Sequence, residues 1–394
     1  MKYLILLAAG MADEPVESLD NRTPLEAAQT PTLDALARGG KTGSVKMIPE
    51  DLPASEEVAL LAALGYSPHK HFTGEGGHAL GDAPFNQGEG RSAYRFNMVT
   101  APDGVLLDHA AGQITPREAE SLLATLSGAL GRPDVQFHVG RGFSGAAALP
   151  QGDGAVLCAP PETLIGQPLE KHLPHGGDCA LAKRIIELSR ELFTEHEVNR
   201  VRADLGENPA DALWLWGPGW APVLQPFQAR YGLRGAMVAA AESARGLGKL
   251  LGLHTPLVAG ATGGYRTDYV AKAQAALKLI KEYDLVVLHV AAPAEASLEG
   301  NIQRKVAAIQ EMDAMVAAPL AEFARGRDDT RLMVISTHLA SVTQRRRLRA
   351  EVPCVLFGAG LEPVRQARFS EETASAGELE AKQGETLLPY FLRP

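Results

Sequence analysis

The sequence predicts an α/β fold with a mostly parallel sheet sandwiched by helices. Two observations lead to this prediction. Short apolar runs ending in glycine, proline or polar residues are typical of strands buried on both faces of a parallel sheet. These runs alternate with segments whose apolar residues follow the helical period, which is the pattern of an α/β fold. The predicted strands are 2–10, 154–160, 211–219, 235–242, 284–293, 331–338 and 353–360, and the predicted helices are 30–40, 180–196, 269–284 and 302–326.

The composition limits the function classes. With 394 residues, the chain has room for one to three domains, and its 45% apolar and 22% charged residues are ordinary for a soluble globular protein. The formal net charge of -9 argues against nucleic acid or an anionic membrane as a partner, because both need a basic surface. Three cysteines without CxxC spacing argue against a disulfide scaffold and a cysteine-rich zinc site. The short apolar run at 3–9 is better explained as a buried strand than as a signal peptide. No segment has the ~18 apolar residues of a membrane span. We therefore expect a cytoplasmic protein.

Functional residues are expected in the segments that follow the strands, because ligands of open α/β sheets bind beyond the carboxyl ends of the strands. Three such segments are AAGMAD at 8–13, AAPAEASLEGN at 291–301 and STHLASVTQRRRLRA at 336–350. The first looks like a loop built to hold a metal ion, yet Ala8 and Ala9 stand where that chemistry needs an acid.

Several segments resemble the archaeal-type, cofactor-independent phosphoglycerate mutases of the alkaline phosphatase superfamily. The resemblance is carried by the opening MKYLILLAAGMADEPVESLDNRTPLEAAQTPTLDALARGG, by EDLPASEEVALLAALGYSPHKHFTG, YRFNMVTAPDGVLLDHAAGQI and NPADALWLWGPG, and by the segments after strands named above. It implies a phosphatase-like core, placed at 1–114 and 207–394, with a smaller inserted α/β domain at 115–206. It also implies a phosphoryl transfer through a serine nucleophile and two divalent ions (Mn, Zn or Mg).

The ligand positions that the resemblance implies carry few ligands here. The first-strand aspartate falls on Ala9, and the nucleophilic serine falls on Glu56, with Ser55 one place earlier. The remaining ligand positions fall on Ala294, Leu298, His338, Leu339 and Arg347. The last third of the chain contains no Asp-His pair. The sequence therefore predicts a degenerate member that has lost its metal site and its nucleophilic serine, and no metal cofactor is expected.

Two replacement chemistries stay open. A rebuilt metal site could use Glu56, His338 and a glutamate from 295–299, and Glu56 could act as a carboxylate nucleophile, as in aspartyl-phosphate enzymes. The alternative is that these are ordinary polar residues, and His289 in particular could be a structural histidine.

An arginine run is the other candidate replacement. Arg345, Arg346, Arg347 and Arg349 occupy the loop of the last implied metal ligand. Guanidinium groups bind phosphate or carboxylate without a metal. Arg245 and Arg95 match positive residues of the family, so the predicted anion-binding set is Arg95, Arg245, Arg345 and Arg347. A solvated basic loop is the alternative.

These observations predict a phosphoglycerate-mutase-like pseudoenzyme with a binding or regulatory role. Its ligand would be a small phosphorylated or carboxylated metabolite, and a homo-oligomer or a protein partner stays open. The second hypothesis is an active enzyme with a rebuilt site, either a mutase that converts 2-phosphoglycerate to 3-phosphoglycerate or a related phosphotransferase such as a proposed homoserine kinase. A third is a purely structural protein.

Overall fold

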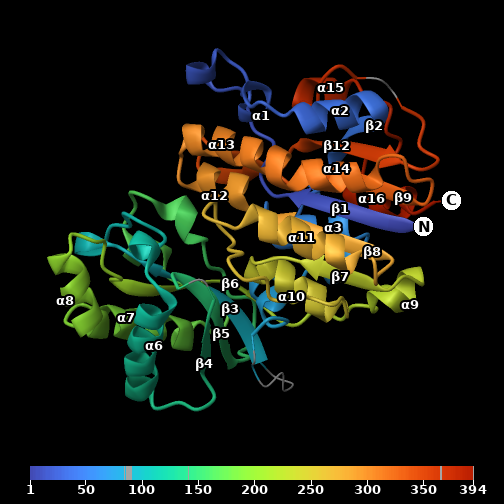
Figure 1. The fold of residues 1–394 in the computed structure, drawn as a ribbon. Helices are drawn as coiled ribbons and strands as arrows, with labels where there is room; N and C mark the ends of the chain where they lie inside the picture. The colour runs from blue at the N-terminus through green and yellow to red at the C-terminus, as the bar shows by residue number, and fades with distance from the viewer. Residues whose placement is uncertain (84, 86–90, 141, 364–365, 394) are drawn as a thin grey trace. The chain divides into compact units, whose positions relative to one another are not determined.

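The computed structural model describes residues 1–83, 85, 91–140, 142–363 and 366–393, and these residues form two compact units (Figure 1). Unit 1 comprises Met1–Phe72 and Val223–Pro394, and unit 2 comprises Thr73–Pro222.

Unit 1 is built on a mostly parallel six-stranded sheet in the order β2-β12-β9-β1-β8-β7. Its strands are β1 (Lys2–Ala8), β2 (Lys41–Lys46), β7 (Gly235–Val238), β8 (Leu285–Val290), β9 (Thr330–Ser336) and β12 (Glu351–Gly358), and a small ribbon pairs β10 (Leu339–Ser341) with β11 (Arg346–Leu348). Strands β9, β1, β8 and β7 run parallel, whereas β12 is antiparallel to both of its neighbours. The predicted fold class is therefore confirmed.

Helices cover both faces of this sheet because β1 is apolar on both sides. Tyr3, Ile5 and Leu7 belong to one buried cluster, and Leu4, Leu6 and Ala8 belong to another, as the two-residue period of a strand requires. The first cluster includes residues of α3 (Glu56–Ala63), α9 (Phe227–Tyr231), α10 (Glu242–Leu250) and α16 (Gly384–Phe391). The second includes residues of α1 (Pro24–Ala27), α2 (Pro31–Gly39), α11 (Tyr269–Leu279), α12 (Ala292–Leu298), α13 (Ile302–Met312), the π-helical turn η6 (Asp313–Ala317) and α14 (Ala318–Ala324). Short helices α4 (Pro68–His71) and α15 (Glu371–Ser375) complete the unit.

Unit 2 has an antiparallel four-stranded sheet in the order β4-β5-β3-β6. Its elements are α5 (Glu75–Ala79), β3 (Arg91–Val99), α6 (Pro116–Leu130), β4 (Gln136–Val139), β5 (Ser144–Pro150), α7 (Ala180–Phe193), α8 (Glu197–Asp204) and β6 (Ala212–Gly219). Trp214, Phe96 and Phe193 are fully buried in its core.

The bounds of unit 2 are wider than the inserted domain expected at 115–206. Strands β3 and β6 lie outside that range, but they pair with each other, and β3 also pairs with β5. Because these hydrogen-bonded strands cannot be divided between two cores, the second unit begins at Thr73 and ends at Pro222.

Two of the predicted strands need correction. Residues 154–160 form no strand, because only Leu157 makes a bridge, with His175, in a segment bounded by glycines and prolines. The strand predicted at 211–219 forms as β6, but it is antiparallel to β3 and belongs to the sheet of unit 2. Six of the seven predicted strands and all four predicted helices otherwise coincide with observed elements, although 302–326 contains the π-helical turn η6.

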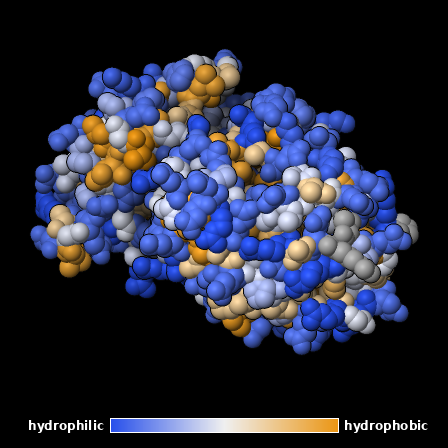
Figure 2. Space-filling view, turned by 90° about the horizontal axis from the view of Figure 1, so that it is seen from above, coloured by the Kyte–Doolittle hydropathy of each residue, from blue (hydrophilic) through white to orange (hydrophobic). Residues whose placement is uncertain are grey.

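Among the described residues, no helix has the length and apolar character needed to cross a membrane. Figure 2 shows hydrophilic side chains over most of the face it draws, with hydrophobic side chains gathered in separate patches.

Candidate functional site

The carboxyl ends of three neighbouring strands meet at one edge of the unit 1 sheet. Ala8 at the end of β1 is aligned with Val290 of β8 and with Ser336 of β9. The backbone continues this alignment past the strands, because Ala9 N–H donates to Val290 O at 2.8 Å and Ala294 N–H donates to Ala9 O at 3.0 Å. The segments after the three strands are thus brought together, as the sequence predicted.

The centre of this edge is apolar. Ala9, Ala291 and Ala294 form a small buried cluster of their own, exposed by 0%, 8% and 6%. The packing is close, because a β-carbon at Gly10 would lie 2.6 Å from Ala294 Cα. The alanines at two implied ligand positions therefore touch each other, and neither has a side-chain donor atom. Of the two leucines at such positions, Leu339 is 7% exposed, and Leu298 is half-buried at the end of α12.

Four buried polar side chains and one half-buried arginine belong to the same unit, and we call them the Glu56 cluster: Glu56, Ser243, His289, His338 and Arg347. Its members come from α3, α10, β8, the turn after β9, and β11.

The Glu56 carboxylate contacts two members of the Glu56 cluster, Ser243 and His289. Glu56 opens α3, where Ser55 caps the helix by accepting a hydrogen bond from Val58 N–H at 3.3 Å. Its Oε2 accepts a hydrogen bond from the Ser243 hydroxyl at 2.8 Å, and its Oε1 lies 2.9 Å from Nε2 of His289. Oε2 is thus hydrogen-bonded, whereas Oε1 has the close approach of His289 Nε2 without hydrogen-bond geometry, although the side chain is only 11% exposed.

Electrostatics fix the protonation states of two members. Burial raises the pKa of the Glu56 carboxyl, but the contact with His289 and the charge of Arg347 outweigh it and hold that pKa well below its usual range. Burial, reinforced by the charge of Arg347, lowers the pKa of His338 to about 3. At neutral pH the cluster thus contains an ionised carboxylate and a neutral His338.

Imidazole nitrogens of the Glu56 cluster stay unsatisfied. His338 Nδ1 lies 3.0 Å from the Thr337 hydroxyl, but its Nε2 is buried and has no hydrogen-bond partner among the described residues. Nδ1 of His289 is likewise buried without one. Such atoms are costly in a native interior and are typical of places where a ligand or water completes the bonding.

The predicted anion-binding arginines are spread out. Arg347 is half-buried on β11 and acts on Glu56 and His338 through its charge. Arg345 is exposed with φ 53° and lies over Gly300, where a side chain would overlap its guanidinium group. Arg346 is exposed and donates to Gln344 Oε1 at 2.9 Å.

The other arginines of the prediction lie elsewhere. Arg349 donates to the carbonyl of Leu52 at 2.6 Å. Arg245 is 7% exposed on α10, two residues after Ser243. Arg95 belongs to unit 2, where its guanidinium lies 5.2 Å from the ring centroid of Trp216.

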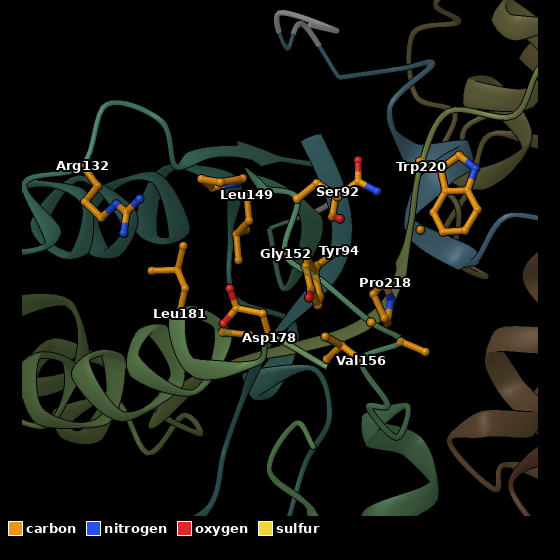
Figure 3. A pocket seen from close by; sticks show the side chains of 16 residues that line it. Ser92, Tyr94, Arg132, Leu149, Gly152, Val156, Asp178, Leu181, Pro218 and Trp220 are labelled. Atoms are coloured by element: carbon orange, nitrogen blue, oxygen red, sulfur yellow. The ribbon is translucent and has the colours of Figure 1, made fainter. Parts of the chain in front are cut away.

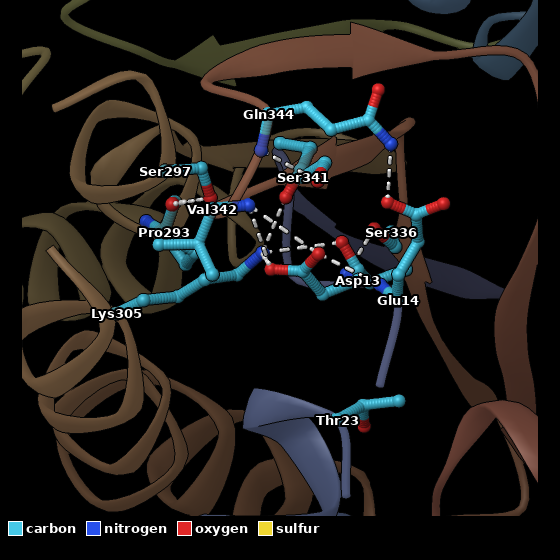
Figure 4. A network of polar contacts seen from close by, with 12 residues as sticks. Asp13, Glu14, Thr23, Pro293, Ser297, Lys305, Ser336, Ser341, Val342 and Gln344 are labelled. Atoms are coloured by element: carbon cyan, nitrogen blue, oxygen red, sulfur yellow. Dashed lines mark hydrogen bonds and ion pairs between the residues drawn. The ribbon is translucent and has the colours of Figure 1, made fainter. Parts of the chain in front are cut away.

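The sequence interpretation missed a second, mostly buried polar group, which we call the Lys305 network: Asp13, Thr23, Lys305 and Glu371. Figure 4 shows Asp13, Thr23 and Lys305 of this network. The ammonium group of Lys305 donates to Asp13 Oδ2 at 2.7 Å and to the carbonyls of Ala340 and Ala12 at 2.7 and 3.3 Å. Glu371 accepts from Asp13 N–H at 3.0 Å and from the Thr23 hydroxyl at 2.8 Å. The signal was present in the sequence, because Lys305, Ala308, Ile309 and Met312 follow the helical period of a buried stripe.

Unit 2 contains a cavity of about 280 Å³ (Figure 3). Tyr94, Trp220, Arg132 and Asp178 are among its lining residues. The lining includes none of the predicted site residues.

Comparison with known proteins places these observations in a family. The model of the metalloenzyme superfamily matches residues 1–390. The chain is 35% identical to the 2,3-bisphosphoglycerate-independent phosphoglycerate mutase of Methanothrix thermoacetophila and 33% identical to that of Methanosarcina mazei, in each case over 100% of both chains. The chain belongs to the cofactor-independent phosphoglycerate mutase family of the metalloenzyme superfamily. The PH0037 protein of Pyrococcus horikoshii has the same fold, with a TM-score of 0.78, 23% identity, and coverage of 99% of this chain and 96% of that one.

Membership of a metalloenzyme superfamily implies divalent metal ions. Such ions need several carboxylate or imidazole ligands that converge on one point. Within the described ranges, no group of three or more His, Cys, Asp and Glu side chains is arranged to hold a metal ion. The rebuilt site considered from the sequence, with Glu56, His338 and a glutamate from 295–299, stays a prediction.

Proposed function

We propose that this phosphoglycerate mutase family member carries out no metal-dependent phosphoryl transfer and has a binding or regulatory role. One observation carries the proposal: the Ala9, Ala291 and Ala294 cluster fills the strand edge where the resemblance requires metal ligands. Two divalent ions would have to neutralise the charge on a transferring phosphoryl group. Alanine side chains cannot coordinate them.

The Glu56 cluster supports a chemistry of binding. A small phosphorylated or carboxylated metabolite would find imidazole donors and the positive charge of Arg347 there, and guanidinium groups bind such anions without a metal. The net charge of -9 disfavours nucleic acid as a ligand. A homo-oligomer or a protein partner is part of the same proposal.

Metal binding tests this proposal. The purified protein is treated with a chelator and then incubated with added Mn²⁺, Zn²⁺ or Mg²⁺. Its metal content and its melting temperature are both measured. We expect less than 0.1 ion per chain and no metal-induced shift in melting temperature, because an ion that binds the native state must raise its stability. The mutase of Methanosarcina mazei, treated identically, is the positive control. Near-stoichiometric metal with a clear shift would overturn the proposal.

The second candidate function is phosphoglycerate mutase itself. Relatives that carry this name are 33–35% identical over the whole chain, which favours a retained activity. It would require metal ligands from outside the implied positions. This candidate predicts near-stoichiometric metal and a clear shift in melting temperature in the metal experiment.

A further inference from the structure

The Glu56 carboxylate has the surroundings of a bound anion. One oxygen accepts from Ser243 at 2.8 Å, and the other lies 2.9 Å from His289 Nε2. Arg347 adds positive charge from β11. Hydroxyl, imidazole and guanidinium groups are the donors with which proteins bind small oxyanions.

The same surroundings are unusual for a residue at the start of a helix. Acidic side chains there normally lie in solvent, where they interact with the helix dipole. The side chain of Glu56 is instead 11% exposed, and His289 beside it is 1% exposed. A buried charge is tolerated only when paired groups compensate for its lost hydration.

We propose that Glu56 is a built-in occupant of a small-oxyanion site, and that an incoming phosphate or carboxylate group competes with its carboxylate for Ser243, His289 and Arg347. This inference rests on the proposed binding function, and it names the residues of the binding site and the residue that blocks it. Two anions cannot share these donors, because like charges a few ångströms apart repel strongly in a buried site. The native protein is therefore held in a self-blocked state, and a ligand binds tightly only when Glu56 moves out.

A buried imidazole atom supports the competition. Nε2 of His338 has no partner within the described part of the chain while Glu56 is in place. A ligand with more oxygens than a carboxylate could satisfy further donors. This unsatisfied atom favours a phosphate group over a carboxylate as the incoming ligand.

Neutralising Glu56 tests the inference. Glu56→Gln keeps the shape of the side chain and its hydrogen bond from Ser243 but removes the negative charge. We expect inorganic phosphate, measured by isothermal titration calorimetry at constant ionic strength, to bind this variant at least ten-fold more tightly than the native chain. Adding Arg347→Gln to the variant should abolish the gain. Glu50→Gln is the matched control, since it removes the same charge from an exposed position and should change nothing.

A smaller side chain gives an independent readout. Glu56→Ala leaves the donors without any anion, so acetate should raise its melting temperature more than that of the native chain. Equal phosphate affinity of the Glu56→Gln and native proteins would overturn the inference, as would an equal gain in Glu50→Gln. If Glu56→Ala does not fold, Glu56→Gln alone decides. Metal-stimulated mutase turnover by the native chain would instead overturn the proposed function, so the two failures are distinguishable.

Discussion

Replacing Lys305 by methionine is expected to lower the free energy of unfolding by roughly 3–5 kcal/mol, because it leaves Asp13 as a buried charge without its partner. Lys305 is 0% exposed and Asp13 is 3% exposed. The ammonium group makes three contacts, at 2.7 Å to Asp13, 2.7 Å to Ala340 O and 3.3 Å to Ala12 O. Methionine fills most of the space of the lysine stem, so the loss comes from polar groups left unsatisfied, at about 1–3 kcal/mol each, and little comes from a cavity.

The assay is urea unfolding at pH 7.5 followed by far-ultraviolet circular dichroism. Tryptophan fluorescence is unsuitable, because Trp214, Trp216 and Trp220 all lie in unit 2, whereas Lys305 lies in unit 1. Lys278→Met, at an exposed position on α11, is the matched control and should change the free energy of unfolding by less than about 0.5 kcal/mol.

A double-mutant cycle identifies the partner. If Lys305 stabilises the fold through Asp13, the variant with Asp13→Asn and Lys305→Met will lose less than the sum of the single losses, because the second change removes the uncompensated charge. A loss below about 1 kcal/mol for Lys305→Met, or strict additivity in the cycle, would refute the reasoning.

Three further predictions concern the same unit. Gly10→Ala should lower the free energy of unfolding in urea more than Gly326→Ala does. Both glycines have a positive φ (65° and 71°), but only at Gly10 would the new β-carbon lie 2.6 Å from Ala294 Cα. Equal losses would contradict the close packing. Burial raises the pKa of Glu371 to about 7, so this acid stabilises the fold below its unfolded pKa and that contribution is lost as the pH rises towards 7. The melting temperature of Glu371→Gln minus that of the native chain should therefore be larger at pH 8 than at pH 5. A difference that does not change with pH would contradict this prediction. The pKa of His338 is lowered to about 3, so its contribution to stability is complete above pH 6.5 and is lost as the pH falls towards 3. Between pH 6.5 and 4, the melting temperature of His338→Leu should therefore decline less steeply than that of the native chain. An equal slope would count against a buried neutral imidazole.

Local patterns predicted the core of unit 1 well. The apolar runs of β1, β8 and β9 form strands whose side chains are buried on both faces of the sheet. A continuous run of apolar residues predicts this burial directly. The same pattern failed at 154–160, where an equally apolar run makes only a bridge at Leu157. Whether such a run becomes a strand depends on the availability of a partner strand, which the local sequence does not contain.

The candidate site could be predicted only in part. The resemblance pointed to Ala9, Glu56 and Ala294, and the structure brings Ala9 and Ala294 into one cluster. It could not reveal that Glu56 contacts His289 and Ser243, because these residues lie 233 and 187 positions away in the chain. Such pairings depend on the strand order and on side-chain directions.

The arginine run shows the same limit. Arg345, Arg346 and Arg347 look equivalent in the sequence, but Arg346 and Arg347 are neighbours on β11, where successive side chains point to opposite faces, and Arg345 precedes that strand with φ 53°. Arg347 acts on the Glu56 cluster, Arg345 lies over Gly300, and Arg346 contacts Gln344. A charge run therefore predicts a basic loop, and the backbone decides which of its members reaches the site.

The most direct test of the central claim is turnover between 2-phosphoglycerate and 3-phosphoglycerate by the purified chain in saturating Mn²⁺, with the mutase of Methanosarcina mazei as the active control. The account predicts a rate indistinguishable from the no-enzyme background, because Ala9, Ala294 and Leu339 offer no ligands to the ions that the reaction needs. Metal-stimulated turnover above that background, in a preparation free of other mutases, would contradict it.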